Sequence, residues 1–203
     1  NSDGNDEYDY FNEDGKLIRR ETKFGNGAIR IDHFNENGKI IKRETINQKG
    51  EIQIDHFDDK GRLVKRETKN QNGENQIDYF DEKGRLISRE TELKNGSRKI
   101  DYFDANGRLT KTEIRKLNGD IQIDHFDKNG KLTKREKISQ NGDNQIIEYF
   151  DKNGKMTKRE SKNQNGDIQI DYFDENGKLS KRETTNEDGQ HQTSTPLLSE
   201  HNE

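Results

Sequence analysis

A unit of 23 residues recurs along nearly the whole chain and can be followed by its phenylalanines. Successive phenylalanines are 23 residues apart, with one interval of 24: Phe11, Phe34, Phe57, Phe80, Phe103, Phe126, Phe150 and Phe173. A fixed period of this length is typical of a repeat array. We therefore expect eight similar copies over residues 8–184, a stub over residues 1–7 and a disordered tail over residues 185–203.

The composition alone would place the chain near the disordered class. Only 24% of its 203 residues are hydrophobic, whereas 38% are charged, and such chains bury little apolar surface. The apolar residues nevertheless recur at fixed positions in every copy, and disorder requires no such register. The pattern therefore predicts an ordered array without a globular core.

Each copy contains two glycines at fixed positions, separated by short segments of alternating character. The first series is Gly15, Gly38, Gly61, Gly84, Gly107, Gly130, Gly154 and Gly177, and the second is Gly27, Gly50, Gly73, Gly96, Gly119, Gly142, Gly166 and Gly189. Glycines at this spacing disfavour helix, and Asn-Gly or Lys-Gly after Asp or Asn favours tight turns. We predict an all-β fold in which tandem β-hairpin repeats form an elongated, twisted, single-layer antiparallel sheet.

Pairing residues about the two turns predicts a register. The first turn fits a three-residue loop with a glycine bulge, which sets Phe34 opposite Ile40 and Asp32 opposite Lys42. The second turn is interpreted as a four-residue loop, because that choice sets Lys42 opposite Asp55. Both turns then agree on rows in which opposite charges face each other.

These rows leave neither face of the predicted sheet apolar throughout. One face carries a Phe/Leu row, an Asp/Lys row in which Ser88 is an exception, and a Gln/Glu row. The other carries a His/Tyr row alternating with Ile, Val or Thr, and an Ile/Arg row. A sandwich or closed barrel needs an apolar face, so we expect a single-layer sheet that is exposed to solvent on both faces. The His/Tyr row is the candidate binding row: Tyr10, His33, His56, Tyr79, Tyr102, His125, Tyr149 and Tyr172.

The 24-residue interval contains one extra residue. We place it in the segment 145–148, as a β-bulge at Ile146 or Ile147, because a single insertion within a strand is most simply absorbed in this way.

Charge and composition exclude several partners and reactions. The 37 basic and 41 acidic residues are interleaved, so no basic stripe is available for nucleic acid. The chain has no cysteine and no apolar run long enough to enter a membrane. We expect a monomer without cofactors. Its absent start methionine suggests a fragment of a longer protein.

Metal-binding and catalytic arrangements are not predicted. Histidines of the His/Tyr row recur two strands apart, about 9 to 10 Å, which is too far to share one ion. The segment Asp127-Lys128-Asn129-Gly130 superficially resembles a calcium loop but lacks the later ligands, so a turn is favoured. The predicted Asp/Lys row is a solvated charge ladder, and no nucleophile motif is present. We expect no enzyme.

The motif Phe-Asp-x-x-Gly-Arg/Lys-Leu resembles the YD repeats of bacterial Rhs and teneurin-type proteins, which read Tyr-Asp-x-x-Gly-Arg-Leu. Examples are the segments Phe57-Asp58-Asp59-Lys60-Gly61-Arg62-Leu63 and Phe103-Asp104-Ala105-Asn106-Gly107-Arg108-Leu109. The resemblance covers about residues 8–184, although the return arm is about two residues longer here. Other bacterial hairpin repeats built on Tyr-x-x-Asn-Gly-Lys-Leu are similar too. In Rhs proteins the resemblance implies a spiralling shell around a toxic domain.

Three functions are compatible with these observations. The favoured one is a non-enzymatic stalk or spacer of a bacterial cell-surface or secreted protein, connected with adhesion. The second is a binding module that holds a host surface protein or glycan on one face of the sheet. The third is a fragment of an Rhs-like toxin shell.

Overall fold

The computed structural model describes residues 4–195, which form seventeen strands and no helix. They divide into two compact units that meet in sequence between Gly107 and Arg108. The first unit contains β1 (Asp6–Phe11), β2 (Leu17–Lys23), β3 (Ile29–Phe34), β4 (Ile40–Ile46), β5 (Ile52–Phe57), β6 (Leu63–Lys69), β7 (Asn75–Phe80), β8 (Leu86–Glu92) and β9 (Arg98–Phe103). The second contains β10 (Leu109–Arg115), β11 (Ile121–Phe126), β12 (Leu132–Ile138), β13 (Gln145–Phe150), β14 (Met156–Lys162), β15 (Ile168–Phe173), β16 (Leu179–Thr185) and β17 (His191–Ser194).

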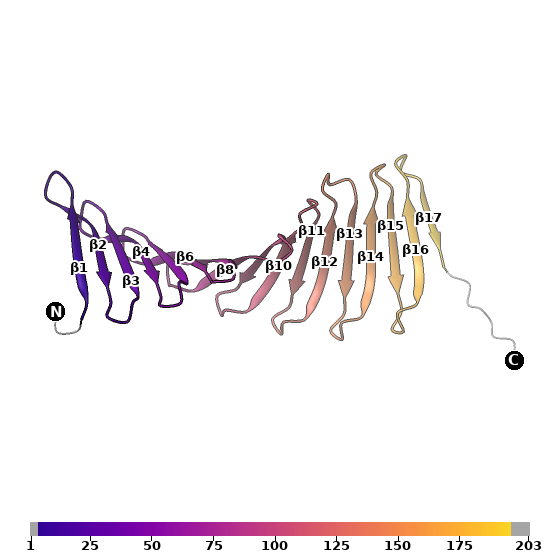
Figure 1. The fold of residues 1–203 in the computed structure, drawn as a ribbon. Coiled ribbons are helices and arrows are strands. Elements are labelled where there is room, and N and C mark those ends of the chain that lie inside the picture. Colours follow the sequence, from indigo (N-terminus) through magenta and orange to yellow (C-terminus); the bar gives the residue numbers. More distant parts are fainter. Residues whose placement is uncertain (1–3, 196–203) are drawn as a thin grey trace. The chain divides into compact units, whose positions relative to one another are not determined.

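Within each unit every strand pairs antiparallel with the strands before and after it in sequence (Figure 1). No hydrophobic side chain among residues 4–195 is fully buried. The buried residues are polar and include Asp32, Asp55, Asp78 and Asp171. The prediction of an all-β, single-layer array of tandem hairpins is therefore confirmed within both units.

Both turns of the repeat adopt the same tight loop. In the first, the Asn35 amide donates to Lys39 O at 2.9 Å and the Gly38 amide donates to Asn35 O at 2.9 Å. In the second, the corresponding bonds join Asn47 to Glu51 and Gly50 to Asn47, at 3.1 and 2.9 Å. Gly50 has a φ of 76°, the left-handed region that favours glycine. The second turn is thus also a three-residue loop, and the predicted four-residue loop is wrong.

The predicted register is correct at the first turn and wrong beyond it. Phe34 faces Ile40 as expected, but the register then shifts between His33 and Phe34, so His33 faces Lys42 and Asp32 faces Arg43. The skipped residue, Ile41, is a β-bulge. Because a shift of one residue moves side chains to the other face, the Asp/Lys row is in fact an Asp/Arg row, and the His/Tyr row alternates with Lys.

The same shift recurs in the hairpins that begin each repeat of both units. The skipped residues are Ile18, Ile41, Val64 and Ile87 in the first unit, and Thr133, Thr157 and Ser180 in the second. In the second unit their hydroxyls donate to strand carbonyls. For example, Thr133 Oγ1 lies 3.1 Å from His125 O.

The extra residue of the 24-residue interval lies in a turn, not in a strand. β13 pairs with β12 without interruption, with Ile147 opposite Glu136 and Ile146 opposite Lys137. The loop between them is longer, since the Ser139 amide donates to Asn144 O, five residues on, at 3.0 Å. The predicted bulge at Ile146 or Ile147 is wrong, because an extra loop residue leaves the strand register intact.

The ends of the array also differ from the expected boundaries. β1 begins at Asp6, inside the expected stub. Part of the expected disordered tail forms β17, which pairs with β16 through Thr193 opposite Glu183. The turn before β17 repeats the second-series bonds, with the Gly189 amide donating to Asn186 O at 2.9 Å. Residues 1–3 and 196–203 of the two predicted segments lie outside the described residues.

Candidate functional site

The shift at the bulge determines which side chains share a face. We call the face that carries the His/Tyr row the aromatic face and the opposite one, which carries the aspartates, the aspartate face. Strand alternation places the candidate row on the aromatic face of each unit: Tyr10, His33, His56, Tyr79 and Tyr102 in the first, and His125, Tyr149 and Tyr172 in the second.

Aromatic rings of this row contact cations of neighbouring strands. The Lys158 and Lys181 ammonium groups lie 5.8 and 5.3 Å from the centre of the Tyr172 ring, one on each side. The Arg19 guanidinium lies 4.7 Å from the Tyr10 ring. Such cation–π contacts stabilise neighbouring strands. Binding of an external molecule by the whole row stays a prediction.

The histidines of the row contact glutamates two positions further along the facing strand. The Nε2 atoms of His33, His56 and His125 lie 2.9 Å from Oε1 of Glu44, Glu67 and Glu136, respectively. Lys65 Nζ approaches the same Glu67 oxygen at 2.8 Å. The Lys65 hydrogen bond lowers the pKa of Glu67, with a further contribution from His56, against the opposing effect of burial. No group of three metal-ligating acidic or histidine side chains occurs between residues 4 and 195.

The aspartate face holds its carboxylates in ion pairs. Arg66 donates to Asp55 through Nε at 2.7 Å and Nη2 at 3.0 Å, and Gln53 donates to Asp55 at 3.1 Å. Equivalent bidentate pairs join Asp9 to Arg20, Asp78 to Arg89, Asp124 to Arg135 and Asp171 to Arg182. The Arg182 bond lowers the pKa of Asp171 despite burial. Carboxylates fixed in this way are structural links between strands.

The segment that resembles a calcium loop forms a turn. The Asp127 carboxylate accepts the backbone amides of Asn129 at 2.7 Å and Lys131 at 3.0 Å. Its pKa is lowered by the Lys131 amide and then by the Asn129 amide, with burial opposing them. The favoured interpretation of this segment as a turn is therefore confirmed.

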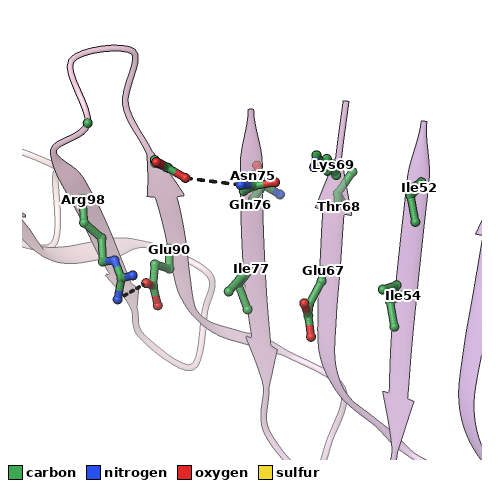
Figure 2. A pocket seen from close by; sticks show the side chains of 12 residues that line it. Ile52, Ile54, Glu67, Thr68, Lys69, Asn75, Gln76, Ile77, Glu90 and Arg98 are labelled. Atoms are coloured by element: carbon green, nitrogen blue, oxygen red, sulfur yellow. Dashed lines mark hydrogen bonds and ion pairs between the residues drawn. The ribbon is translucent and has the colours of Figure 1, made fainter. Parts of the chain in front are cut away.

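A groove on the aromatic face of the first unit was not predicted from the sequence. It has a volume of about 470 Å³ and is lined by residues of β5 to β9. Ile54, Glu67, Ile77 and Glu90 form a row across β5, β6, β7 and β8 (Figure 2). Ser88, noted as an exception in the sequence, lies on the same strand as Glu90. The predicted register assigned it to the wrong row, which hid its relation to the groove.

The comparisons with known proteins assign no family. No family model and no curated protein matches the chain. A solved structure, the "Crystal Structure of TcdB2-TccC3-Cdc42", is similar over 95% of this chain with a TM-score of 0.26 and 10% identity. The chain spans 14% of the length of that chain. At this TM-score the likeness carries no argument, and the repeat β-architecture rests on the chain's own strands.

No helix with the length and hydropathy of a membrane crossing occurs among the described residues.

Proposed function

We propose that this chain is a non-enzymatic spacer, or stalk, of a bacterial cell-surface or secreted protein. The observation that carries the proposal is that, within each unit, strands contact only their sequence neighbours. In such arrays stability is approximately a sum of repeat and nearest-neighbour terms, so whole repeats can be added or removed without rebuilding the rest. The property that varies with repeat number is length, and this suits a spacer.

The side chains support the same role. Aspartates and histidines that could serve acid–base chemistry elsewhere are engaged in cross-strand contacts, as in Asp55 with Arg66 and His56 with Glu67. Charged rows on both faces keep a single layer soluble, and they oppose stacking against other sheets. The resemblance to YD and related hairpin repeats supports a bacterial surface or secreted location, and the projection of an adhesive domain is part of this proposal.

The test is a deletion of one whole copy, residues 58–80, from the full chain. Spin labels on cysteines at Lys39 and Lys83, in first-series turns flanking the deleted copy, report their separation by pulsed electron resonance. A spacer should keep its circular dichroism spectrum and shorten the separation by about 9.6 Å, the width of two strands. Loss of the β-spectrum or an unchanged separation would refute the proposal.

The toxin-shell alternative makes a different prediction. A shell fragment requires a toxic domain in the parent protein, whereas a spacer requires a surface anchor or an adhesive domain. The parent sequence decides between them.

A further inference from the structure

The row of cations on the aromatic face departs from the repeat at one position, two residues along β8 from the groove residue Glu90. Lys42 and Lys65 are the cations of the aromatic-face row on β4 and β6, and Ser88 occupies the equivalent place on β8. Ser88 faces Tyr79 on one side and Tyr102 on the other. A small side chain therefore stands between two tyrosines where the repeat elsewhere places a long cation.

The missing lysine changes the surroundings of Glu90. Glu44 and Glu67 each have a lysine of their own strand at 2.8 Å. Glu90 instead contacts Arg98 at 2.8 Å (Figure 2). The Arg98 side chain is 62% exposed, whereas that of Glu90 is 17% exposed. An exposed arginine can turn into solvent at low cost, so Glu90 can accept another cation from a ligand in the groove.

The row of the groove alternates apolar and acidic groups at a fixed spacing. Ile54 and Ile77 lie two strands apart, as do Glu67 and Glu90. Two strand spacings amount to about 9.6 Å. A polyproline II helix repeats every three residues at 3.1 Å per residue, or about 9.3 Å per turn. The repeat of a β-strand ligand, about 6.7 Å, and the two-turn repeat of an α-helix, about 10.8 Å, fit less well.

We propose that this groove binds a basic, proline-rich peptide in the polyproline II conformation, lying across β5 to β8. Prolines at every third position pack on Ile54 and Ile77. An arginine on an adjacent ridge of the peptide reaches Glu90, the glutamate of this row whose own strand offers no lysine, whereas Glu67 is held by Lys65. The preformed polyproline II helix loses little entropy on binding, which favours recognition of this kind. This binding function goes beyond a spacer and does not depend on it.

The ligand for the test is a synthetic peptide of Pro-Pro-Arg triplets, about twelve residues long so that it exceeds the groove. Its spacing control has the same composition and charge but an irregular order of Pro and Arg. Binding of both dye-labelled peptides to the full chain is measured by fluorescence anisotropy. We expect the triplet peptide to bind at least about tenfold more tightly than the control, because only its prolines coincide with both isoleucines while an arginine reaches Glu90.

The decisive variant is Ser88→Lys, which restores the side chain found at Lys65 and is therefore compatible with the fold. It should weaken binding of the triplet peptide about tenfold or more, because the new lysine would pair with Glu90 as Lys65 pairs with Glu67. The matched control is Glu36→Gln, which also raises the net charge by one unit but lies exposed in a first-series turn, away from the row of Ile54 and Glu90, and it should leave binding unchanged. Nuclear magnetic resonance shifts should locate the peptide at Ile54 and Ile77.

Three results would overturn the proposal. They are no binding of the triplet peptide, equal binding of the two peptides, and equal weakening by Ser88→Lys and Glu36→Gln. The last two would indicate charge attraction without a site. A circular dichroism melt of each variant verifies that changed binding does not reflect unfolding.

Discussion

The two sets of turns share one backbone geometry but differ in how their side chains support it. At the first-series turns, the residue before the loop is always Asp or Asn. Asp58, for example, accepts the amides of Lys60 and Arg62, each at 2.9 Å. At the second-series turns the same position is Phe24, Asn47, Asn70, Leu93, Lys116, Ser139, Asn163 and Asn186 in successive copies.

The second-series turns therefore find several substitutes for the first-series cap. Where Asn is present, as at Asn70, its side chain accepts the Glu74 amide at 2.9 Å. Where Leu93 is present, Asn95 inside the loop accepts the Ser97 amide at 3.0 Å. Ser139 caps the longer loop by accepting the Asn144 amide at 3.0 Å. Several ways of capping allow changes of sequence and length along the second-series edge, by which we mean the side of the sheet where the second-series turns lie.

The first-series turns are also linked to one another. At several of these turns the cation that follows the glycine reaches a loop carbonyl of the next copy: for example, Lys39 Nζ lies 2.8 Å from Asp59 O, and Lys155 Nζ lies 2.7 Å from Glu175 O. Each such loop is followed by the Phe/Leu pair and the β-bulge. This edge therefore fixes the register of the array, whereas the second-series edge accommodates variation.

Insertion of one residue into a turn should give the largest difference in folding stability between the two edges. An alanine inserted between Asp59 and Lys60 displaces the Asp58 cap, the Phe57–Leu63 pair and the link of Arg62 to Glu82. We expect a loss of about 2 kcal/mol or more, from hydrogen bonds and a cross-strand pair.

The matched insertion at the other edge lies between Gly50 and Glu51, after the glycine, where the loop before β13 has its extra residue. It imitates the natural loop before β13 and should cost about 1 kcal/mol or less, because lengthening a loop adds little closure entropy. Urea unfolding of the two variants followed by circular dichroism gives the comparison. Equal losses would contradict the distinction between the edges.

Removal of one capping side chain should lower stability less than an insertion does, and the loss should again be larger at the first-series edge. Asp58→Ala should lower the unfolding midpoint more than Asn70→Ala, because Asp58 accepts two backbone amides and the Arg62 side chain, whereas Asn70 accepts one amide and donates to the Glu74 carboxylate. Asp58→Asn keeps the acceptor oxygen and serves as the control. Thermal melts in which Asn70→Ala is the more damaging change would refute this order.

Acid should weaken the first-series edge selectively. The Arg85 side chain, followed by the Arg85 and Lys83 amides, lowers the pKa of Asp81 to about 2. Since the folded pKa lies below the unfolded value of about 3.9, the stabilisation is complete above that value and is lost as the pH falls towards 2. Asparagine caps at the second edge do not titrate.

Carbon-13 titration of the Asp81 carboxyl provides the measurement, with an expected midpoint of about 2. The variant Asp81→Asn should show a smaller loss of thermal stability between pH 4 and pH 2 than the parent chain. An Asp81 midpoint near 4 would show that the cap does not bind the ionised form preferentially.

The same difference between edges explains what could be predicted from the sequence. Period, strands, turns and the Phe34–Ile40 pair follow from glycine and phenylalanine positions, because glycine in the left-handed region and alternating strands leave local signals. The β-bulge at Ile41 leaves no such signal, since a β-branched residue fits a bulge and a strand alike. Without that bulge, every row beyond Phe34 shifts by one residue.

The same bulge limited how much of the candidate site could be predicted from the sequence. The His and Tyr residues do share one row, but the residues between them were assigned as Ile, Val or Thr in place of Lys. The groove depends on the row of Ile54, Glu67, Ile77 and Glu90, which forms only in the shifted register. Ser88 was visible as an irregularity, but its meaning required knowledge of which residues face it.

The smallest expected effect comes from shortening the long loop before β13. Deletion of Asp143, the extra residue after Gly142, returns the Ser139–Asn144 loop to the length and glycine position of the other second-series turns. The strand pairs on both sides, such as Ile138 with Gln145, remain in register. We expect a stability change of no more than about 0.5 kcal/mol, because the change in closure entropy is small.

Deletion of Ile147 is the control, since it also returns the copy to 23 residues but removes the residue from β13. It transfers part of β13 to the opposite face and separates Glu148 from Lys137, whose Nζ lies 3.1 Å from the glutamate. This variant should be clearly less stable than the Asp143 deletion in urea unfolding. If the two deletions were equally tolerated, β13 would be able to shift its register, and the tolerance for length changes would not be confined to the second-series edge.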